Sequence, residues 1–276
     1  MDQTRNEARL IGEYTDRDFL GGLRRLDLKA TAGWAFLPNV YSPGAPDAKN
    51  GPVAKLSAEL EQPRVFHPDF KLLTRVELER GLEPAYNYLG GRWKIGVVWQ
   101  PTTHLSIFPS YNLEAYRLEQ GVTSLGGSAP PLLFGCPEVC VLSYLEQRIE
   151  WDKRNDAQEP KTGYLLALSL QEGGGLLGGS FSYFKVEPEG RFYFSLGQEQ
   201  RFTVAGRLRL GTLRPASGND LESPIVSRFF SGGNNMRGFN SRRLSPMYVV
   251  PGAHDNFTGV VVPIGGNGLK IGRAHV

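Results

Sequence analysis

Hydrophobic and polar residues alternate along most of this chain. In the clearest run, residues 25–36, apolar side chains at the even positions alternate with polar or small ones at the odd positions. A period of two places successive side chains on opposite faces of a β-strand, so the run predicts a strand with one apolar and one wet face. By the same reasoning the sequence predicts about ten strands before residue 214, at 8–15, 25–36, 55–61, 70–79, 88–99, 103–118, 138–151, 162–172, 178–196 and 200–212.

The connections between these strands differ in length between the two ends of the predicted sheet. Long connections at 38–52, 119–137 and 214–258 fall on one side of the strand order, although two others on that side, 83–87 and 173–178, are short. The opposite side carries short turns, with residues 152–162 as the exception. Short turns at one end and long loops at the other are typical of a transmembrane barrel, and a β-sandwich has no reason to sort them.

Strand length favours the same architecture. Many runs reach about 11–15 residues, against about 5–6 in ordinary globular sheets, and about 9–11 tilted residues cross a bilayer. The sequence therefore predicts an all-β, antiparallel transmembrane β-barrel with its apolar face towards lipid and its charged face towards the lumen. Seven residues are expected to face outward: Leu26, Leu28, Trp34, Leu56, Leu60, Val204 and Leu208. Four are expected to face inward: Lys29, Glu59, Arg207 and Arg209.

Composition adds limits rather than a function. The chain has 276 residues, 34 of them glycine, with 11% aromatic residues, as expected of a turn-rich β protein. A net charge of +3 is too small to indicate nucleic-acid binding. No apolar run approaches about 18 residues, so no transmembrane helix is predicted. The first residues lack the apolar segment of a secretory signal, so an exported protein is expected to begin further upstream.

One polar connection contains a distinctive motif. Residues 228–239 read Arg-Phe-Phe-Ser-Gly-Gly-Asn-Asn-Met-Arg-Gly-Phe, and residues 263–269 read Pro-Ile-Gly-Gly-Asn-Gly-Leu. The two stretches resemble, in order, the conserved loop of the BamA/TamA family of outer-membrane assembly barrels and the strand that follows it. In that family the loop folds back into the barrel lumen. The resemblance assigns the lumen-loop motif to Phe229, Phe230, Gly232, Gly233, Arg237, Gly238 and Phe239, and the following-strand motif to Gly265, Gly266 and Asn267.

The resemblance also implies how much of the family's barrel is present. The family's loop follows strand eleven of sixteen, so residues 1–269 are expected to form about 10–11 strands, from strand two into strand twelve, with loop 214–258 entering the lumen. The POTRA repeats and the seam strands would lie outside this sequence. Residues 270–276 are expected to be a non-native tail, because residues 271–276 resemble a translated sequencing adapter.

The function implied by the resemblance is the assembly or translocation of outer-membrane proteins, by insertion of β-barrel or autotransporter chains, in the bacterial outer membrane. The family is not enzymatic, so no catalytic residue, cofactor or metal is expected. The implied partners are the lipid bilayer, unfolded outer-membrane clients and, through POTRA domains, periplasmic or inner-membrane assembly factors, with no nucleic acid. A fragment without the seam is not expected to act alone.

Arg237 carries a further expectation from the resemblance. In the family this arginine meets an acidic residue on a later strand, which this sequence lacks. Loop 228–240 is therefore expected to be positioned by Phe229, Phe230 and Phe239 and by backbone bonds near the two glycines. Arg237 would reach a substitute carboxylate, Glu77 or Glu146, or stay hydrated.

Other candidate sites are weak. Residues 173–178 fit Gly-x-Gly-x-x-Gly but precede a strand-like run, so a glycine turn is favoured over a phosphate cradle. Cys136 and Cys140 are compatible with a small disulfide beside an external loop, with free thiols, or with a metal site if two more ligands were nearby; the disulfide is favoured. The carboxylates at 77, 79, 146 and 150 are interpreted as lumen solvation.

Three other functions remain open at this stage. The chain could come from a two-partner secretion translocator, from a passive outer-membrane porin, or from a barrel fused to a lipase-like domain. The sequence upstream of residue 1 would separate them, since POTRA repeats favour assembly, a catalytic domain favours the enzyme, and neither favours a pore.

Overall fold

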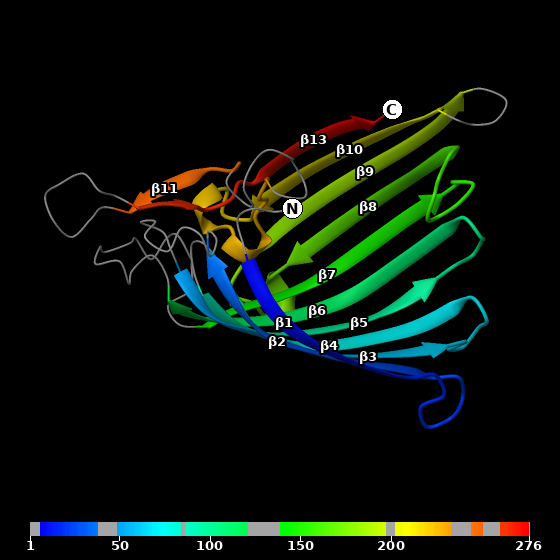
Figure 1. Ribbon diagram of the computed structural model, residues 1–276, viewed down its shortest axis with the longest axis horizontal. Helices are drawn as coiled ribbons and strands as arrows, with labels where there is room; N and C mark the ends of the chain where they lie inside the picture. The colour runs from blue at the N-terminus through cyan, green and yellow to red at the C-terminus, as the bar shows by residue number, and fades with distance from the viewer. Residues whose placement is uncertain are drawn as a thin grey trace, which may run out of the picture.

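A single antiparallel sheet forms the body of this computed structural model (Figure 1). The structure describes residues 6–37, 49–83, 87–120, 139–196, 202–232, 244–250 and 260–275. The sheet has eleven strands in the order β1 to β10 followed by β13. Its strands are β1 (Asn6–Asp16), β2 (Arg25–Leu37), β3 (Lys49–Pro63), β4 (Phe70–Leu82), β5 (Asn87–Trp99), β6 (Leu105–Gln120), β7 (Val139–Asp152), β8 (Gly163–Gly173), β9 (Tyr183–Leu196), β10 (Phe202–Pro215) and β13 (Gly268–His275). The predicted all-β antiparallel architecture is confirmed.

Each strand up to β10 pairs with the next one along the chain, so all ten strands predicted before the polar connection are present. Two boundaries differ from the prediction by more than three residues. β3 begins at Lys49, inside the predicted loop 38–52, because its ladder with β2 continues to the Leu37–Lys49 pair. β9 begins at Tyr183 instead of 178, because Ser180 N donates to Val141 O of β7 (2.7 Å) and a 3-10 turn, η3 (Gly175–Leu177), precedes it.

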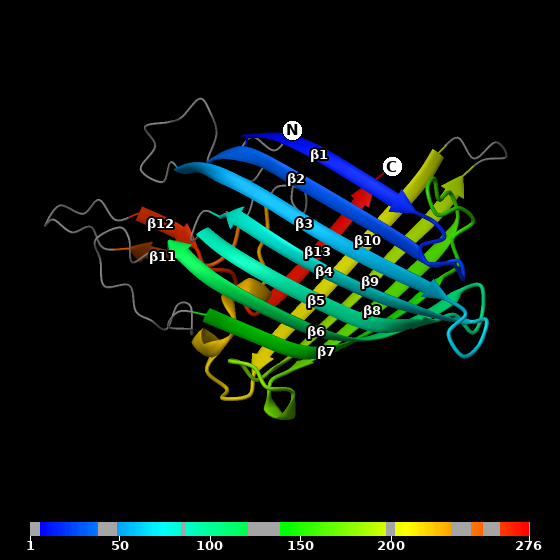
Figure 2. The ribbon, with the colours of Figure 1, turned by 90° about the horizontal axis from the view of Figure 1, so that it is seen from below.

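The sheet is curled. In Figure 2, β1 to β7 lie in front of β8, β9, β10 and β13, so the two ends of the strand order approach the same side. On the inner face, side chains two strands apart meet: Lys94 Nζ of β5 lies 2.8 Å from Glu146 Oε2 of β7, across β6. The opposite, outer face presents apolar side chains to the surroundings.

The predicted sorting of side chains between these faces is confirmed. Leu28, Trp34, Leu56 and Leu208 are exposed on the outer face. The four residues expected inside all form ion pairs on the inner face. Lys29 pairs with Glu13, Glu59 with Arg75, Arg207 with Glu189, and Arg209 with Glu187. Polar side chains on alternate residues thus gather on one wall.

The connection after β10 contains short elements. These are the 3-10 turns η4 (Asp220–Glu222) and η5 (Ile225–Ser227) and a two-stranded hairpin of β11 (Met247–Val250) and β12 (Val260–Pro263). The chain then returns to the sheet through β13. Within the described residues, no helix is long and apolar enough to cross a membrane.

The expected boundary after residue 269 falls inside a strand. The ladder between β10 and β13 runs from the Thr212–Gly268 pair to the Ala205–His275 pair without interruption. Lys270 to His275 therefore take part in the sheet.

Candidate functional site

The described parts of the two motifs singled out from the sequence lie against each other on the inner face. The segment 220–231, called here the docked segment, leaves β10 and folds back over the sheet beside residues 264–267. Phe229 N donates to Gly266 O (2.8 Å) and Gly266 N donates to Phe229 O (2.9 Å), which makes an isolated antiparallel bridge. Residues almost forty positions apart are thereby joined by backbone hydrogen bonds.

The ring of Phe229 is the apolar anchor of the docked segment. Only 7% of the residue is exposed, and it belongs to the main buried cluster with Leu213 and Ile225. Lys185 Nζ lies 4.6 Å from the ring centroid, within the range of a cation–π contact. Gly211 of β10 makes room for the ring, since a Cβ at that position would lie 2.5 Å from Phe229 Cζ.

Arg228 is the polar anchor beside it. The residue is 7% exposed, and its guanidinium donates to neutral oxygens: Nε to Ser223 Oγ (2.8 Å), Nη2 to Ser223 O (3.0 Å) and Nη1 to Ile264 O (3.4 Å). Desolvation lowers the pKa of this guanidinium, and Asp220 opposes the effect. An arginine remains charged after such a shift, so Arg228 acts as a fixed clamp between the docked segment and the chain entering β13.

Asn267 joins this clamp to the sheet. Its Nδ2 donates to Asp220 O (3.1 Å) and Asp220 Oδ1 (3.0 Å), while its Oδ1 accepts from Ser223 Oγ (2.8 Å). Its backbone carbonyl accepts from Leu213 N (2.8 Å) at the end of β10. The predicted motif residue thus fixes η4 against the main sheet.

Glycine is required at position 265 of the same motif. Its φ of +73° lies in the left-handed region, which side chains rarely adopt. A Cβ there would also lie 2.8 Å from Phe230 Cζ and 2.9 Å from Arg228 Cβ. The Gly265–Gly266 pair lets the backbone pass directly beneath the aromatic pair.

The rest of the predicted loop motif is only partly visible. Gly232 is buried with a φ of +117°, and Leu244 N donates to Ser231 O (3.0 Å), so the chain leaves and re-enters the site at neighbouring points. Gly233, Arg237, Gly238 and Phe239 lie outside the described residues. The expected positions of the Arg-Gly-Phe tip remain predictions.

The two carboxylates considered as partners for Arg237 have cations of their own. Glu77, 8% exposed, lies 2.6 Å from Arg75 Nη2, 3.3 Å from Lys55 Nζ and 3.5 Å from Arg92 Nη1. Glu146 pairs with Lys94 and accepts from Ser169 Oγ (3.0 Å). The inner wall is therefore a network of matched charges.

Tyrosines extend this network beneath the docked segment. Tyr144 Oη donates to Glu114 Oε1 (2.7 Å), and Tyr116 donates to the other oxygen of the same carboxylate. Arg92 Nε donates in turn to Tyr116 Oη (2.7 Å). Buried hydroxyls with charged partners give a rigid floor, which the sequence did not predict because the partners come from different strands.

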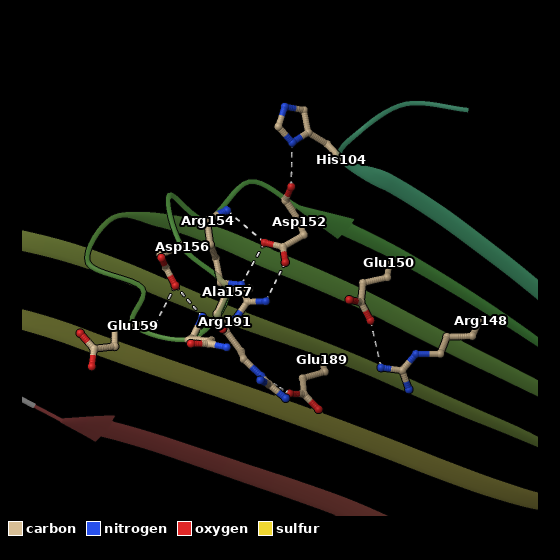
Figure 3. A network of polar contacts seen from close by, with 11 residues as sticks. His104, Arg148, Glu150, Asp152, Arg154, Asp156, Ala157, Glu159, Glu189 and Arg191 are labelled. Atoms are coloured by element: carbon tan, nitrogen blue, oxygen red, sulfur yellow. Dashed lines mark hydrogen bonds and ion pairs between the residues drawn. The ribbon is translucent and has the colours of Figure 1, made fainter. Parts of the chain in front are cut away.

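The long turn between β7 and β8 is a second ordered polar cluster (Figure 3). Arg154 pairs with Asp152 (Nη2 to Oδ2, 2.6 Å) and donates to Ala157 O (3.2 Å). Asp156 Oδ1 accepts from the backbone amides of Glu159 (2.9 Å) and Gln158 (2.6 Å), and these two bonds lower the pKa of the Asp156 carboxyl. This turn is long and nevertheless well defined, because its own side chains satisfy its backbone.

The remaining sequence candidates have structural roles in the described residues. Cys140 is buried in the main cluster and disulfide-bonded, and Cys136 lies outside the described residues. The Gly-x-Gly-x-x-Gly stretch forms the 3-10 turn η3. Gly174 N donates to Ser143 O (3.0 Å), so the backbone pairing between β8 and β7 continues into this stretch. Three site residues were not predicted from the sequence: Arg228, Gly211 and Lys185. Only Arg228 had a signal in the sequence, which is its position directly before the aromatic pair.

Comparisons with known proteins agree with this geometry. Residues 55–273 match the family model described as the Omp85 superfamily domain. The fold is similar to the crystal structure of BamA from Haemophilus ducreyi lacking POTRA domains 1-3, with a TM-score of 0.64 and 15% sequence identity. The match covers 96% of this chain and 51% of that chain, so the present sequence spans about half the length of the solved structure.

Proposed function

The chain belongs to the Omp85 superfamily, and from this premise we propose that it is the barrel portion of a bacterial outer-membrane factor that inserts or translocates other outer-membrane proteins. Its partners would be the bilayer and unfolded clients, and the process would involve no enzymatic step. The observation that carries the proposal is the bridge between Phe229 and Gly266, which anchors a returning loop on the charged inner wall.

The physical basis is the cost of unpaired backbone in lipid. A strand edge inside a bilayer exposes N–H and C=O groups that water cannot reach, so an incoming strand that pairs with it is strongly favoured. Insertion assisted by such strand pairing needs no nucleotide and no metal. It needs a wall that stays folded while an edge opens, and the paired charges of the inner face with the docked segment support such a wall.

The test is client insertion by the complete protein. The full reading frame would be reconstituted into phosphatidylcholine vesicles and mixed with a urea-denatured outer-membrane barrel. Gel mobility with and without heating would report the folded client. Faster folding than in empty vesicles is expected, and Arg237→Ala should slow it while Arg242→Ala, outside the motif, should not.

The alternatives give different readouts in the same vesicles. A steady ionic conductance without faster client folding would indicate a passive porin, and ester hydrolysis would indicate a lipase-like fusion. Equal effects of the two arginine substitutions would contradict a special role for the motif. A dependence on one dedicated secreted partner would favour the two-partner secretion branch.

A further inference from the structure

An apolar groove crosses the outer face of β1 to β5. It is open, has a volume of about 470 Å³ and is lined almost entirely by apolar surface. Its floor is made of small residues, Gly12, Ala30, Ala32 and Ala54, and an added Cβ at Gly12 would meet nothing within 4 Å. Leu56 and Leu78, 53% and 55% exposed, form its walls. The groove is a recess in the surface proposed to face lipid.

Two arginines stand at one end of this groove. Arg80, which lines it, is paired in register with Leu89 of β5, and Leu89 is paired with Arg117 of β6. Both arginines are exposed, and Leu89 between them is 49% exposed. Since adjacent strands lie about 4.8 Å apart, the two guanidinium-bearing residues are separated by roughly 10 Å across the outer face.

The distribution of basic residues on the outer face indicates the depth in the bilayer at which Arg80 and Arg117 lie. Within the described strand residues, the basic side chains at outer positions are Arg80, Arg117, Arg214 and Lys270, all in the half of the sheet near the long connections. The opposite end of the outer face carries exposed aromatics, including Trp99, Trp151 and Phe202. A cation on the lipid face costs several kcal/mol at the bilayer midplane and about 0–1 kcal/mol near the interface, so these arginines belong at the headgroup level.

We propose that the groove and the arginine pair form a binding site for one phosphate-bearing lipid. An acyl chain lies over Gly12, Ala30, Ala32 and Ala54, and the phosphate is bound between Arg80 and Arg117. Guanidinium groups bind phosphate oxygens through paired, charge-assisted hydrogen bonds. Each guanidinium has five N–H donors, so Arg80 can bind a phosphate while keeping its contact within the protein. The site rests on the membrane location proposed above but is independent of client insertion.

A lipid fits this surface better than a protein segment. The groove lies on the apolar face proposed above to meet the bilayer. Of the charged residues that line it, Lys55 and Glu79 pair with each other in the inner-face network, and the outer rim carries Arg80, in complement to a phosphate headgroup. The β4, β5 and β6 strands that carry the rim lie side by side in Figure 2, in the continuous part of the sheet. Each guanidinium near an anionic headgroup strengthens binding by roughly fivefold.

The experiment is a lipid titration of the full chain, folded in a neutral detergent, by native mass spectrometry. Dipalmitoyl phosphatidic acid is compared with dipalmitoyl phosphatidylcholine, and inorganic phosphate is added as a soluble competitor. We expect one phosphatidic acid to bind ahead of all others, with no displacement by phosphate. The double variant Arg80→Gln/Arg117→Gln should weaken this binding by roughly 25-fold, that is, about fivefold for each cation.

Two further variants separate the site from general attraction. Arg214→Gln removes an exposed outer arginine on β10, away from the groove, and should leave the first binding constant within twofold. Ala54→Trp fills the floor while keeping both arginines, and should weaken binding. An equal loss in Arg214→Gln, unchanged binding in Ala54→Trp, or displacement by phosphate would each overturn the site.

Folding of each variant and client insertion are measured separately from lipid binding. Heat-dependent gel mobility checks that each variant is folded, and both kinds of substitution are at exposed positions. Client insertion by the complete protein is measured in phosphatidylcholine vesicles, which offer no anionic lipid. Retained insertion with no lipid selectivity would refute the site alone, whereas selective lipid binding without insertion would refute only the proposed function.

Discussion

Gly211→Ala tests whether the docked segment depends on a socket in β10. The Cβ added by this substitution would lie 2.5 Å from Cζ and 2.7 Å from Cε1 of Phe229, and 3.2 Å from Cβ of Leu269. Carbon atoms in contact stay about 3.5–4.0 Å apart, so the ring must move by roughly an ångström. The ring lies in the main buried cluster and under Lys185, which leaves it little room to do so.

The expected magnitude follows from two opposing effects. Overpacking a well-packed site costs about 1–3 kcal/mol. Replacing glycine by alanine also restricts the unfolded chain, which stabilises the folded state by about 0.4–1 kcal/mol. The net loss in free energy of unfolding for Gly211→Ala is therefore about 1–2 kcal/mol.

Gly206→Ala is the matched control on the same strand. A Cβ at Gly206 would meet nothing within 4 Å, so only the effect on the unfolded chain remains. This variant should gain about 0.4–1 kcal/mol. Urea titrations of the detergent-folded chain, followed by tryptophan fluorescence, would measure both variants, which should shift the midpoint in opposite directions.

A second substitution identifies the ring as the cause. Phe229→Ala alone should cost about 3–5 kcal/mol, as expected for a buried phenylalanine. In that background Gly211→Ala should become stabilising, as Gly206→Ala is, which corresponds to a coupling of about 2 kcal/mol. Additive effects, or equal shifts for Gly206→Ala and Gly211→Ala, would refute the socket.

Three further outcomes are expected. Gly265→Ala should lower the free energy of unfolding by about 1–3 kcal/mol in the same titration, since it combines a left-handed φ with a close contact, while Gly266→Ala, whose Cβ would lie 3.4 Å from its nearest neighbour, should cost less. Glu77→Gln should cost about 1–3 kcal/mol by leaving three cations around a neutral group, against about 0–1 kcal/mol for Glu150→Gln in an exposed pair; equal losses would contradict the buried network. The depressed pKa of Asp156 means that its stabilisation of the β7–β8 turn is present above its unfolded pKa and lost as pH falls through its folded pKa. The protection factors of the two backbone amides that donate to it, corrected for the intrinsic exchange rate at each pH, should therefore fall at low pH, and Asp156→Asn should abolish that pH dependence.

The strands and their faces could be predicted because each depends on local sequence. Polar or small residues alternate with apolar ones through residues 25–36, and charged residues alternate with apolar ones through residues 75–79. The period of two fixes which side chains share a face regardless of partner. The start of β9 could not be predicted this way. Residues 178–182 read as strand, but Ser180 pairs with Val141 instead of extending β9, and that choice depends on where β8 ends.

The candidate site shows the same division. Phe229, Gly265, Gly266 and Asn267 could be selected because they belong to motifs that are continuous in the sequence. Gly211 could not, because its importance arises only when the ring of Phe229 arrives from another part of the chain.

The chemistry of the docked segment differs from that of the wall on which it lies. The wall pairs carboxylates with cations, as Glu187 does with Lys185 (2.8 Å) and Arg209 (2.5 Å). The segment is held by a ring in a glycine socket, by backbone bonds and by an arginine that donates to neutral oxygens. Both cations of Glu187 come from the wall itself, so this charge pairing does not depend on the docked segment. A carboxylate that is matched by cations of its own wall is not left as an uncompensated buried charge when a loop shifts, which is the condition for an inner wall that keeps its structure while other parts of a barrel move.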